Sequence, residues 1–288
     1  MSITTIVATL CDPFRRDFLL RAIESIHQAS ERPVRILVVV NGQSFDKDLL
    51  ALLTEREDIE VVQIAEGSLT KAHIAGRRLV DTEFFSFLDD DDEYLPGALD
   101  LRLGLIETRN GADVVVTNGF ACRAGEDRLM YTRMAGVDAQ PLNELFEENW
   151  LNSGNHLFRT ASVPSRYFED PHPYMEWTWL AFRMAFEGKK IVGTDVPTFR
   201  INDTPGSLSK SVTFISSNIS LYRRMLALKP QRKIVSVIGK RLCNAWHDVS
   251  VFELSAGNRA KAVSAHIRSL TSHPSGLRFL SYTRRLLG

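Results

Sequence analysis

Four consecutive carboxylates, Asp89 to Asp92, are the residues whose type and spacing point most directly to chemistry. They follow residues 84–88, a mostly apolar run that is too short and too β-prone for a helix, so we expect a buried strand there. Alternate side chains of a strand point the same way, which would place Asp89 and Asp91 on one side. Adjacent like charges are costly unless a cation lies among them, and hard oxygen ligands favour Mg²⁺ or Mn²⁺. The strand before this run, and a helix expected to start near Pro96, favour a metal site over a solvated acidic turn.

The residues that precede the acidic run alternate between strand and helix patterns. We expect strands at residues 3–9, 34–40, 59–64 and 83–88, separated by segments of helical periodicity. This alternation predicts an α/β fold with a doubly wound, mostly parallel sheet flanked by helices. Ligands of such sheets bind beyond the carboxyl ends of the strands, which is where Thr9, Asn41 and Asp89 fall.

The second half of the chain has a different pattern. Strand signals recur at residues 113–117, 155–159 and 190–193, whereas residues 118–139 show no regular pattern. From Phe214 onward every segment has helical periodicity. We therefore predict an α/β domain at residues 1–211 and a basic helical C-terminal extension at residues 212–288.

Charge is divided unevenly along a chain whose formal net charge is zero. Residues 212–288 contain thirteen Lys and Arg against only Asp248 and Glu253, a net charge of +11, which leaves −11 on the other 211 residues. A division this sharp indicates two parts with different partners. Nucleic acid is not expected as a partner, because the basic tail carries no nucleic-acid-binding motif and the other part is acidic.

The compartment follows from the cysteines and from the absence of targeting signals. Cys11, Cys122 and Cys243 are far apart and form no CxxC pair, so we expect free thiols in a reducing compartment. The first ten residues lack the basic region of a signal peptide, and no window approaches the ~18 apolar residues of a membrane span. These features predict a cytoplasmic protein.

A series of motifs occurs in a fixed order between residues 3 and 209. The most specific is FLDDDDEYLPGAL, which matches F-L-D-x-D-D-x-x-x-P-x-x-L. The others are the strand ending in Ala8-Thr9, VVVNG, TKAHIAGRRLVDTEF, EWTWLAFRMAFEGKKI, and Arg200 with Ser207-Leu208-Ser209. In this order the chain resembles the family-2 glycosyltransferases, which have the GT-A fold. It departs from their pattern at Val40 and Asn41, where the family has two acids, and at Trp177.

The resemblance implies transfer of a sugar from a nucleotide-sugar donor, with a UDP-sugar favoured, to a hydroxyl of a saccharide or lipid-linked acceptor. It implies a surface polysaccharide or glycolipid as product and inversion at the sugar carbon. A Mn²⁺ or Mg²⁺ ion on Asp91, with Asp89, would stabilise the leaving diphosphate. Asp89 and Asp90 would hold the ribose or water around the ion.

Four further residues are candidates for binding the donor. Thr9 and Asn41 end the first two strands, and the Asn41 amide can bond to the base; the alternative is that Asn41 serves a turn with Gly42. Lys71 and His73, near the start of their helix, can meet phosphate, or they are surface residues of that helix.

The general base is the weakest part of the match. An inverting transfer needs a carboxylate that takes the acceptor proton. Glu176 is the only carboxylate in Met175-Glu176-Trp177, where the family has an acidic pair, and its aromatic neighbours would raise its pKa; Asp170 is the alternative. Glu176 can instead serve only as a cap of its helix.

Three questions stay open at the level of sequence. The basic tail predicts either peripheral contact with a membrane surface or a partner surface, including self-association into a homo-oligomer. A nucleotidyltransferase on a related sheet is a second enzymatic possibility, although LCDPFRRD after the first strand lacks the glycines such enzymes use. A non-catalytic nucleotide-sugar-binding protein is the third, because Val40, Asn41 and Trp177 depart from the pattern.

Overall fold

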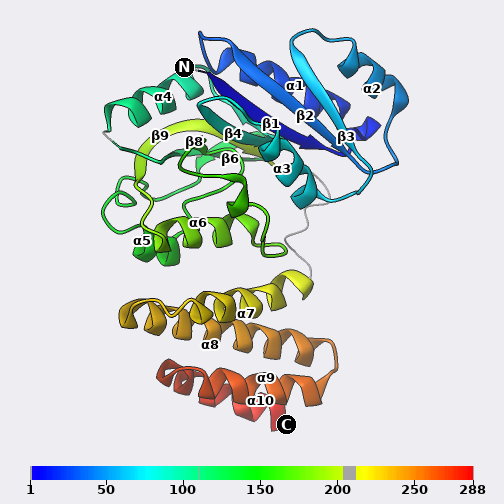
Figure 1. The fold of residues 1–288 in the computed structure, drawn as a ribbon. Helices are drawn as coiled ribbons and strands as arrows, with labels where there is room; N and C mark the ends of the chain where they lie inside the picture. The colour runs from blue at the N-terminus through cyan, green and yellow to red at the C-terminus, as the bar shows by residue number, and fades with distance from the viewer. Residues whose placement is uncertain (1, 110, 204–211, 288) are drawn as a thin grey trace. The chain divides into compact units, whose positions relative to one another are not determined.

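The computed structural model describes residues 2–109, 111–203 and 212–287 (Figure 1). The chain divides into two compact units, which are described separately. The first comprises Met1–Pro171 and Leu180–Pro205, and the second comprises His172–Trp179 and Gly206–Gly288. The predicted domain boundary at residues 211 and 212 adjoins a stretch outside the described residues and stays a prediction. The predicted Ser207-Leu208-Ser209 motif also lies outside them.

Within the described residues, the first unit is built on one nine-stranded sheet. Its order is β3-β2-β1-β4-β8-β6-β9-β5, and β7 pairs with β6 outside this path. The strands are β1 (Ile3–Thr9), β2 (Val34–Asn41), β3 (Ile59–Ile64), β4 (Phe84–Asp89), β5 (Glu93–Tyr94), β6 (Val114–Arg123), β7 (Glu126–Leu129), β8 (His156–Arg159) and β9 (Ile191–Asn202). The first four strands pair in parallel, as their alternation with helices predicts.

The parallel part of the sheet is covered on both faces. All seven residues of β1 and the last six of β2 are buried, which explains their continuous apolar sequence. Helices α1 (Arg16–Gln28), α2 (Lys47–Thr54) and α3 (Leu69–Arg78) follow the first three strands. The chain moves outward from β1 to β3 and then returns past β1 to β4. Right-handed crossovers therefore put α3 on the face opposite α1, and Figure 1 shows α3 in front of the sheet.

Helix α3 lies very close to the sheet at Gly76. A Cβ atom built there would be 2.5 Å from Ile6 Cγ2 and 3.3 Å from Val39 Cγ2. Ser68 starts this helix, because its hydroxyl accepts a hydrogen bond from the Lys71 backbone N–H. The absence of a side chain at Gly76 thus allows α3 to pack directly on β1 and β2.

The antiparallel part of the sheet differs from the sequence prediction. Strand β6 continues past residue 117 and forms a hairpin with β7, and Ala124 and Gly125 in the turn have φ angles of 51° and 83°. The expectation of no regular structure after residue 117 is therefore wrong at this hairpin. All four residues of β7 are exposed, and Leu129 is the one apolar residue among them. The strand therefore lacks the apolar alternation on which a strand prediction depends.

The chain that leaves the four aspartates is tied to the sheet before any helix begins. Tyr94 pairs with Phe199 of β9, and its hydroxyl donates to the Phe87 carbonyl oxygen at 2.8 Å. Helix α4 (Ala98–Thr108) follows Gly97, whose φ is 72°. The helix expected near Pro96 is thus present and starts two residues after it.

The second unit is mainly helical, and the predicted C-terminal helices are present. They are α7 (Val212–Ala227), α8 (Arg232–Ser255), α9 (Arg259–Thr271), the 3₁₀ segment η4 (Pro274–Tyr282) and α10 (Thr283–Leu287). Trp246 lies in their core beside Ile219 and Ala265, and the Arg268 guanidinium lies 4.6 Å from its ring centroid. No helix in the described part of the chain is both long enough and apolar enough to span a membrane.

Candidate active site

Three predicted residues meet where β1, β2 and β4 end. Thr9 Oγ1 donates a hydrogen bond to Asp90 Oδ2 at 2.6 Å, and Asn41 Nδ2 donates to the Thr9 carbonyl oxygen at 2.9 Å. All three side chains are buried. Strands β1 and β4 are neighbours on either side of the reversal in chain direction, which makes this edge a topological switch point. The structure thus joins Thr9, Asn41 and Asp90 at the edge where α/β sheets bind ligands.

The four aspartates form a tight turn, called the acidic turn below (Asp89 to Asp92). The Asp92 backbone N–H donates to the Asp89 carbonyl oxygen at 3.1 Å, so the chain reverses directly after β4. Strand alternation therefore stops at Asp89 and does not decide where Asp91 points. The carboxylates instead sort by their partners: Asp89 accepts from Ser153 Oγ at 2.7 Å, whereas Asp90 and Asp91 share a cation.

That cation is Arg15, which the sequence analysis did not single out as a site residue. Its Nη2 lies 2.7 Å from Asp90 Oδ1 and 2.6 Å from Asp91 Oδ2. Arg15 ends the short 3₁₀ segment η1 (Pro13–Arg15), whose start is fixed by the Asp12 carboxylate accepting from Phe14 N. The signal available in the sequence was a basic residue in the loop after the first strand, at the same sheet edge as the acids.

The four carboxylates of the acidic turn outnumber the one guanidinium, that of Arg15, which forms ion pairs with Asp90 and Asp91. Desolvation, with smaller repulsion from Asp91 and Asp90, raises the pKa of Asp89 to about 6 against the bond from Ser153. Desolvation also raises the pKa of Asp90 to about 6, although Arg15 and Thr9 oppose the rise. The folded chain therefore holds these carboxylates under electrostatic strain that an added cation would relieve.

Asp92 belongs to the same group, although it was not among the predicted site residues. It is 3% exposed, and desolvation followed by repulsion from Asp89 and Asp91 raises its pKa well above the usual value. Asn202, at the end of β9, donates its backbone N–H to Asp92 Oδ1 at 3.1 Å and its Nδ2 to the Asp91 carbonyl oxygen at 2.8 Å. These bonds fix the far side of the turn. A run of four identical residues gave no way to tell which of them is buried.

The acidic turn offers the donor chemistry that Mg²⁺ or Mn²⁺ requires. Among the described residues, no three or more His, Cys, Asp or Glu side chains form a group that could hold a metal ion. A divalent ion shared with phosphates needs only one or two protein carboxylates, because phosphate oxygens and water complete its octahedron. Asp89 and Asp91 are close enough for repulsion to raise the pKa of Asp89. The turn thus fits an ion that binds together with a diphosphate, and it does not fit a closed metal site made by protein alone.

Asn41 has one polar atom that lacks a partner. Its Oδ1 is buried and accepts no hydrogen bond from any described residue, while its Nδ2 donates to the Thr9 carbonyl oxygen. The turn after β2 is made by Gly42, whose φ is 100°, so the Asn41 side chain is not needed to form it. A buried acceptor without a donor is costly, which makes Oδ1 a site for a ligand N–H or O–H group.

The two predicted phosphate ligands of α3 occupy different environments. Lys71 is exposed and forms an ion pair with Glu66. His73 is buried with its ring edge-on to Phe87, 4.9 Å between centroids, and desolvation lowers its pKa to about 4. At neutral pH the His73 ring is therefore uncharged. The binding of phosphate by Lys71 and His73 stays a prediction.

The two candidate bases belong to different units. Asp170 is exposed in the first unit, just after η2 (Ser165–Tyr167). Glu176 belongs to the second unit and is the first residue of α6 (Glu176–Phe186), where its Oε1 accepts the Tyr174 backbone N–H at 3.2 Å. This contact agrees with a role at the start of the helix, and the role of Glu176 as a base stays a prediction.

Comparison with known proteins identifies the class to which this chain belongs. The sequence profile of the family described as "Glycosyl transferase family 2" matches residues 6–170, more than half of the chain and including the whole acidic turn. The chain belongs to this family and is a glycosyltransferase. A comparison with curated proteins found no match.

Solved structures with the same fold come from the glycosyltransferase TarS of S. aureus. The structure of TarS residues 1–349 in complex with UDP-GlcNAc has a TM-score of 0.67 and 13% sequence identity, covering 98% of this chain and 92% of that one. The complex of the same TarS fragment with UDP has a TM-score of 0.57 and 14% identity, covering 96% and 92%. At identities this low the likeness shows the fold alone, and this likeness confirms the predicted GT-A architecture.

Proposed function

We propose that the protein transfers a sugar from a UDP-sugar to an acceptor hydroxyl with the help of a divalent cation. The observation that carries this proposal is the unpaired Asn41 Oδ1 at the edge that also holds the acidic turn. Uracil presents an N3–H group that this oxygen can accept, so the base would lie on Asn41 while the diphosphate reaches the carboxylates. TarS, which has the same fold, is known in complex with UDP and with UDP-GlcNAc, and this supports the choice of nucleotide.

In this proposal Asp91, with Asp89, holds Mn²⁺ or Mg²⁺ against the diphosphate. The bound ion supplies positive charge that stabilises the leaving group as the glycosidic bond breaks. Asp90 and Thr9 are joined by a hydrogen bond beside Asn41, and in this proposal they accept from or donate to ribose hydroxyls. Asp89 would serve the ribose or the water around the ion when it does not contact the ion itself.

The acceptor side of the reaction rests on Glu176. Transfer with inversion needs a carboxylate that accepts the proton of the attacking hydroxyl, and we assign this role to Glu176, with Asp170 as the alternative. Lys71 is an exposed cation in the first turn of α3, and in this proposal it meets a donor phosphate. The proposed acceptor is a saccharide or a lipid-linked saccharide in the cytoplasm.

The second unit would bring the enzyme to an anionic membrane surface, or it would hold two copies of the chain together. Residues 212–288, which make up most of this unit, carry thirteen basic residues against two acidic ones, and this charge favours the anionic surface. Pelleting with anionic vesicles at low salt and release at high salt would support attachment. A dimer in light scattering with no pelleting would instead assign these helices to self-association.

Nucleotide binding to the intact protein tests the proposed donor. With Mn²⁺ present, UDP should raise the melting temperature and CDP should raise it much less, because cytosine carries no hydrogen on N3. Asn41→Ala should abolish the difference between UDP and CDP. Equal stabilisation of the wild-type protein by UDP and CDP, or none by either, would contradict the assignment of Asn41 to the base.

A further inference from the structure

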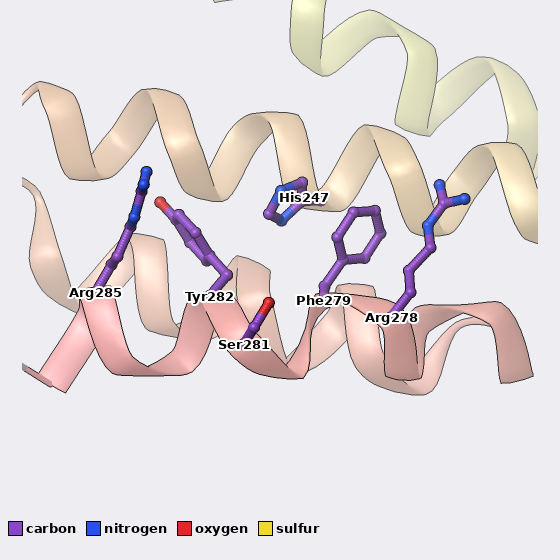
Figure 2. Close-up of a pocket in the computed structure, with 6 residues that line it drawn as sticks. All are labelled: His247, Arg278, Phe279, Ser281, Tyr282 and Arg285. Carbon is purple, nitrogen blue, oxygen red and sulfur yellow. The ribbon is translucent and has the colours of Figure 1, made fainter.

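The second unit contains a cavity that has no part in the proposed reaction. It lies between α8 and the η4–α10 segment and has a volume of about 390 Å³ (Figure 2). Six residues line it: His247, Arg278, Phe279, Ser281, Tyr282 and Arg285. A space of this size accommodates a small polar group together with several carbons of its substituent.

The lining is rich in hydrogen-bond donors and contains no carboxylate. Arg278 and Arg285 each bring a guanidinium group, and Ser281 brings a hydroxyl. Figure 2 shows the two arginines at opposite ends of the row of lining side chains, both extending toward α8. Arg278 also donates to Asn244 Oδ1, which holds it in this position. Two guanidinium groups with no lining acid to neutralise them favour an anion.

Two buried atoms of the lining have no hydrogen-bond partner among the residues that the structure describes. They are Nδ1 of His247 and the hydroxyl oxygen of Tyr282. The His247 ring stacks on Phe279 with centroids 3.8 Å apart and an interplanar angle of 15°, and Tyr282 meets it edge-on at 4.8 Å. Because these contacts fix the His247 ring between two aromatic side chains, it cannot rotate to find another partner without losing them. Unpaired polar atoms in the wall of a cationic cavity indicate that a polar ligand completes it.

We propose that this cavity binds the phosphate group of a phosphate ester. Phosphate offers several acceptor oxygens, enough for both arginines, the Ser281 hydroxyl and the Tyr282 hydroxyl after a small side-chain adjustment. A phospholipid headgroup and a soluble phosphate ester share this chemistry. The proposal does not depend on the sugar transfer proposed above, because all six lining residues lie in the second unit.

Calorimetric titration of the full-length protein with glycerol 1-phosphate tests the proposal, and glycerol alone is the control ligand. Arg285→Gln removes a lining guanidinium, and we expect it to weaken binding by about tenfold, the usual effect of one charge-assisted hydrogen bond. Arg284→Gln is the matched control, because this neighbouring arginine is exposed and does not line the cavity. Both variants change the net charge equally, so only binding at the cavity separates them.

Vesicles distinguish the two sources of phosphate. The same proteins are sedimented with phosphatidylcholine vesicles that contain or lack phosphatidylglycerol. A headgroup in the cavity predicts that Arg285→Gln reduces pelleting more than Arg284→Gln does. A soluble ester predicts saturable binding of glycerol 1-phosphate with no difference between the variants on vesicles. No saturable binding in the titration together with no difference on vesicles, or equal loss for both variants throughout, overturns the proposal.

Tyr282→Phe gives an independent measurement. Without ligand, this variant should melt at a higher temperature than the wild type, because it removes a buried hydroxyl that has no partner. With saturating glycerol 1-phosphate its melting temperature should rise less than that of the wild type. If the variant melts lower than the wild type and keeps the full ligand-induced rise, the hydroxyl has no role in ligand binding and the proposal fails.

Discussion

The acidic turn and the cavity of the second unit both gather charge of one sign, but they do so under opposite conditions. Asp90 and Asp92 are buried, at 5% and 3% exposure, and Arg15 is the cation that pairs with the turn. Arg278 and Arg285 are exposed, and no acid lines their cavity. Like charges that are buried repel strongly, whereas exposed ones are screened by water and salt.

This difference predicts at which site a bound ligand relieves the larger electrostatic cost. At the acidic turn, desolvation raises the pKa values of two carboxylates to about 6, so a bound cation relieves a large electrostatic cost. At the cavity a ligand gains less, and salt should weaken its binding. Substitutions in the turn should therefore change function far more than substitutions in the cavity.

The largest effect is expected from removal of the Asp91 carboxylate. Asp91→Ala should lower the rate of nucleoside diphosphate release by about 10²- to 10³-fold, as for the loss of one group that stabilises transition-state charge. Asp17→Ala, an exposed acid in the first turn of α1, is the control and should keep the wild-type rate. Wild-type activity of Asp91→Ala in the presence of a chelator would contradict the proposed role of the metal.

The next effect concerns the base. Glu176→Gln keeps the size of the side chain and its hydrogen bond to Tyr174 N but cannot take a proton, so turnover should fall by about 10²-fold with donor affinity nearly unchanged. Asp170→Asn is the comparison variant. Full activity of Glu176→Gln combined with loss in Asp170→Asn would move the role to Asp170.

The fold could be predicted well from the sequence, because buried parallel strands such as β1 and β2 are continuous apolar runs. The same logic placed Thr9, Asn41 and the aspartates at one edge. It could not find Arg15 or Ser153, because each reaches the turn through a tertiary contact from a loop. It also missed β7, whose exposed residues carry no hydrophobic signal.

The two units can also be compared by how tightly a glycine is packed in each. Gly76→Ala should lower the free energy of unfolding of the first unit by up to about 3 kcal/mol, because its Cβ would overlap Ile6 on a rigid strand. A Cβ at Gly239 in α8 would have the flexible His273 side chain as its nearest neighbour, at 3.0 Å, and alanine favours the helix, so Gly239→Ala is expected to change the free energy of unfolding by no more than about 1 kcal/mol. Denaturant melts measure both. Equal losses of stability in the two variants would show that the contact of Gly76 with Ile6 is no tighter than that of Gly239 with His273.

The smallest effect is a pH dependence from His73. Its pKa of about 4 in the folded chain lies below the usual 6.5, so the unfolded chain binds more protons between these values. The stability it contributes is complete above pH 6.5 and is lost as the pH falls toward 4. Between pH 7 and pH 5 this loss amounts to about 2 kcal/mol.

Melts of wild type and His73→Gln at pH 7 and pH 5 isolate this contribution, because Asp89 and Asp90 titrate in both proteins and act in the opposite direction. Their raised pKa values make the fold more stable as the pH falls through 6. The variant should therefore lose less stability on acidification than the wild type. An identical change in both proteins would show that His73 does not titrate as its burial implies.

The most direct test of the central claim is the identity of the nucleotide product. The wild-type protein, incubated with a panel of UDP-sugars, Mn²⁺ and candidate saccharide acceptors, should release UDP, and Asp91→Ala should release almost none. Release of pyrophosphate would contradict the claim and indicate a nucleotidyltransferase. Binding of a UDP-sugar without any release of UDP would equally contradict it, and would leave a protein that binds the donor but does not transfer its sugar.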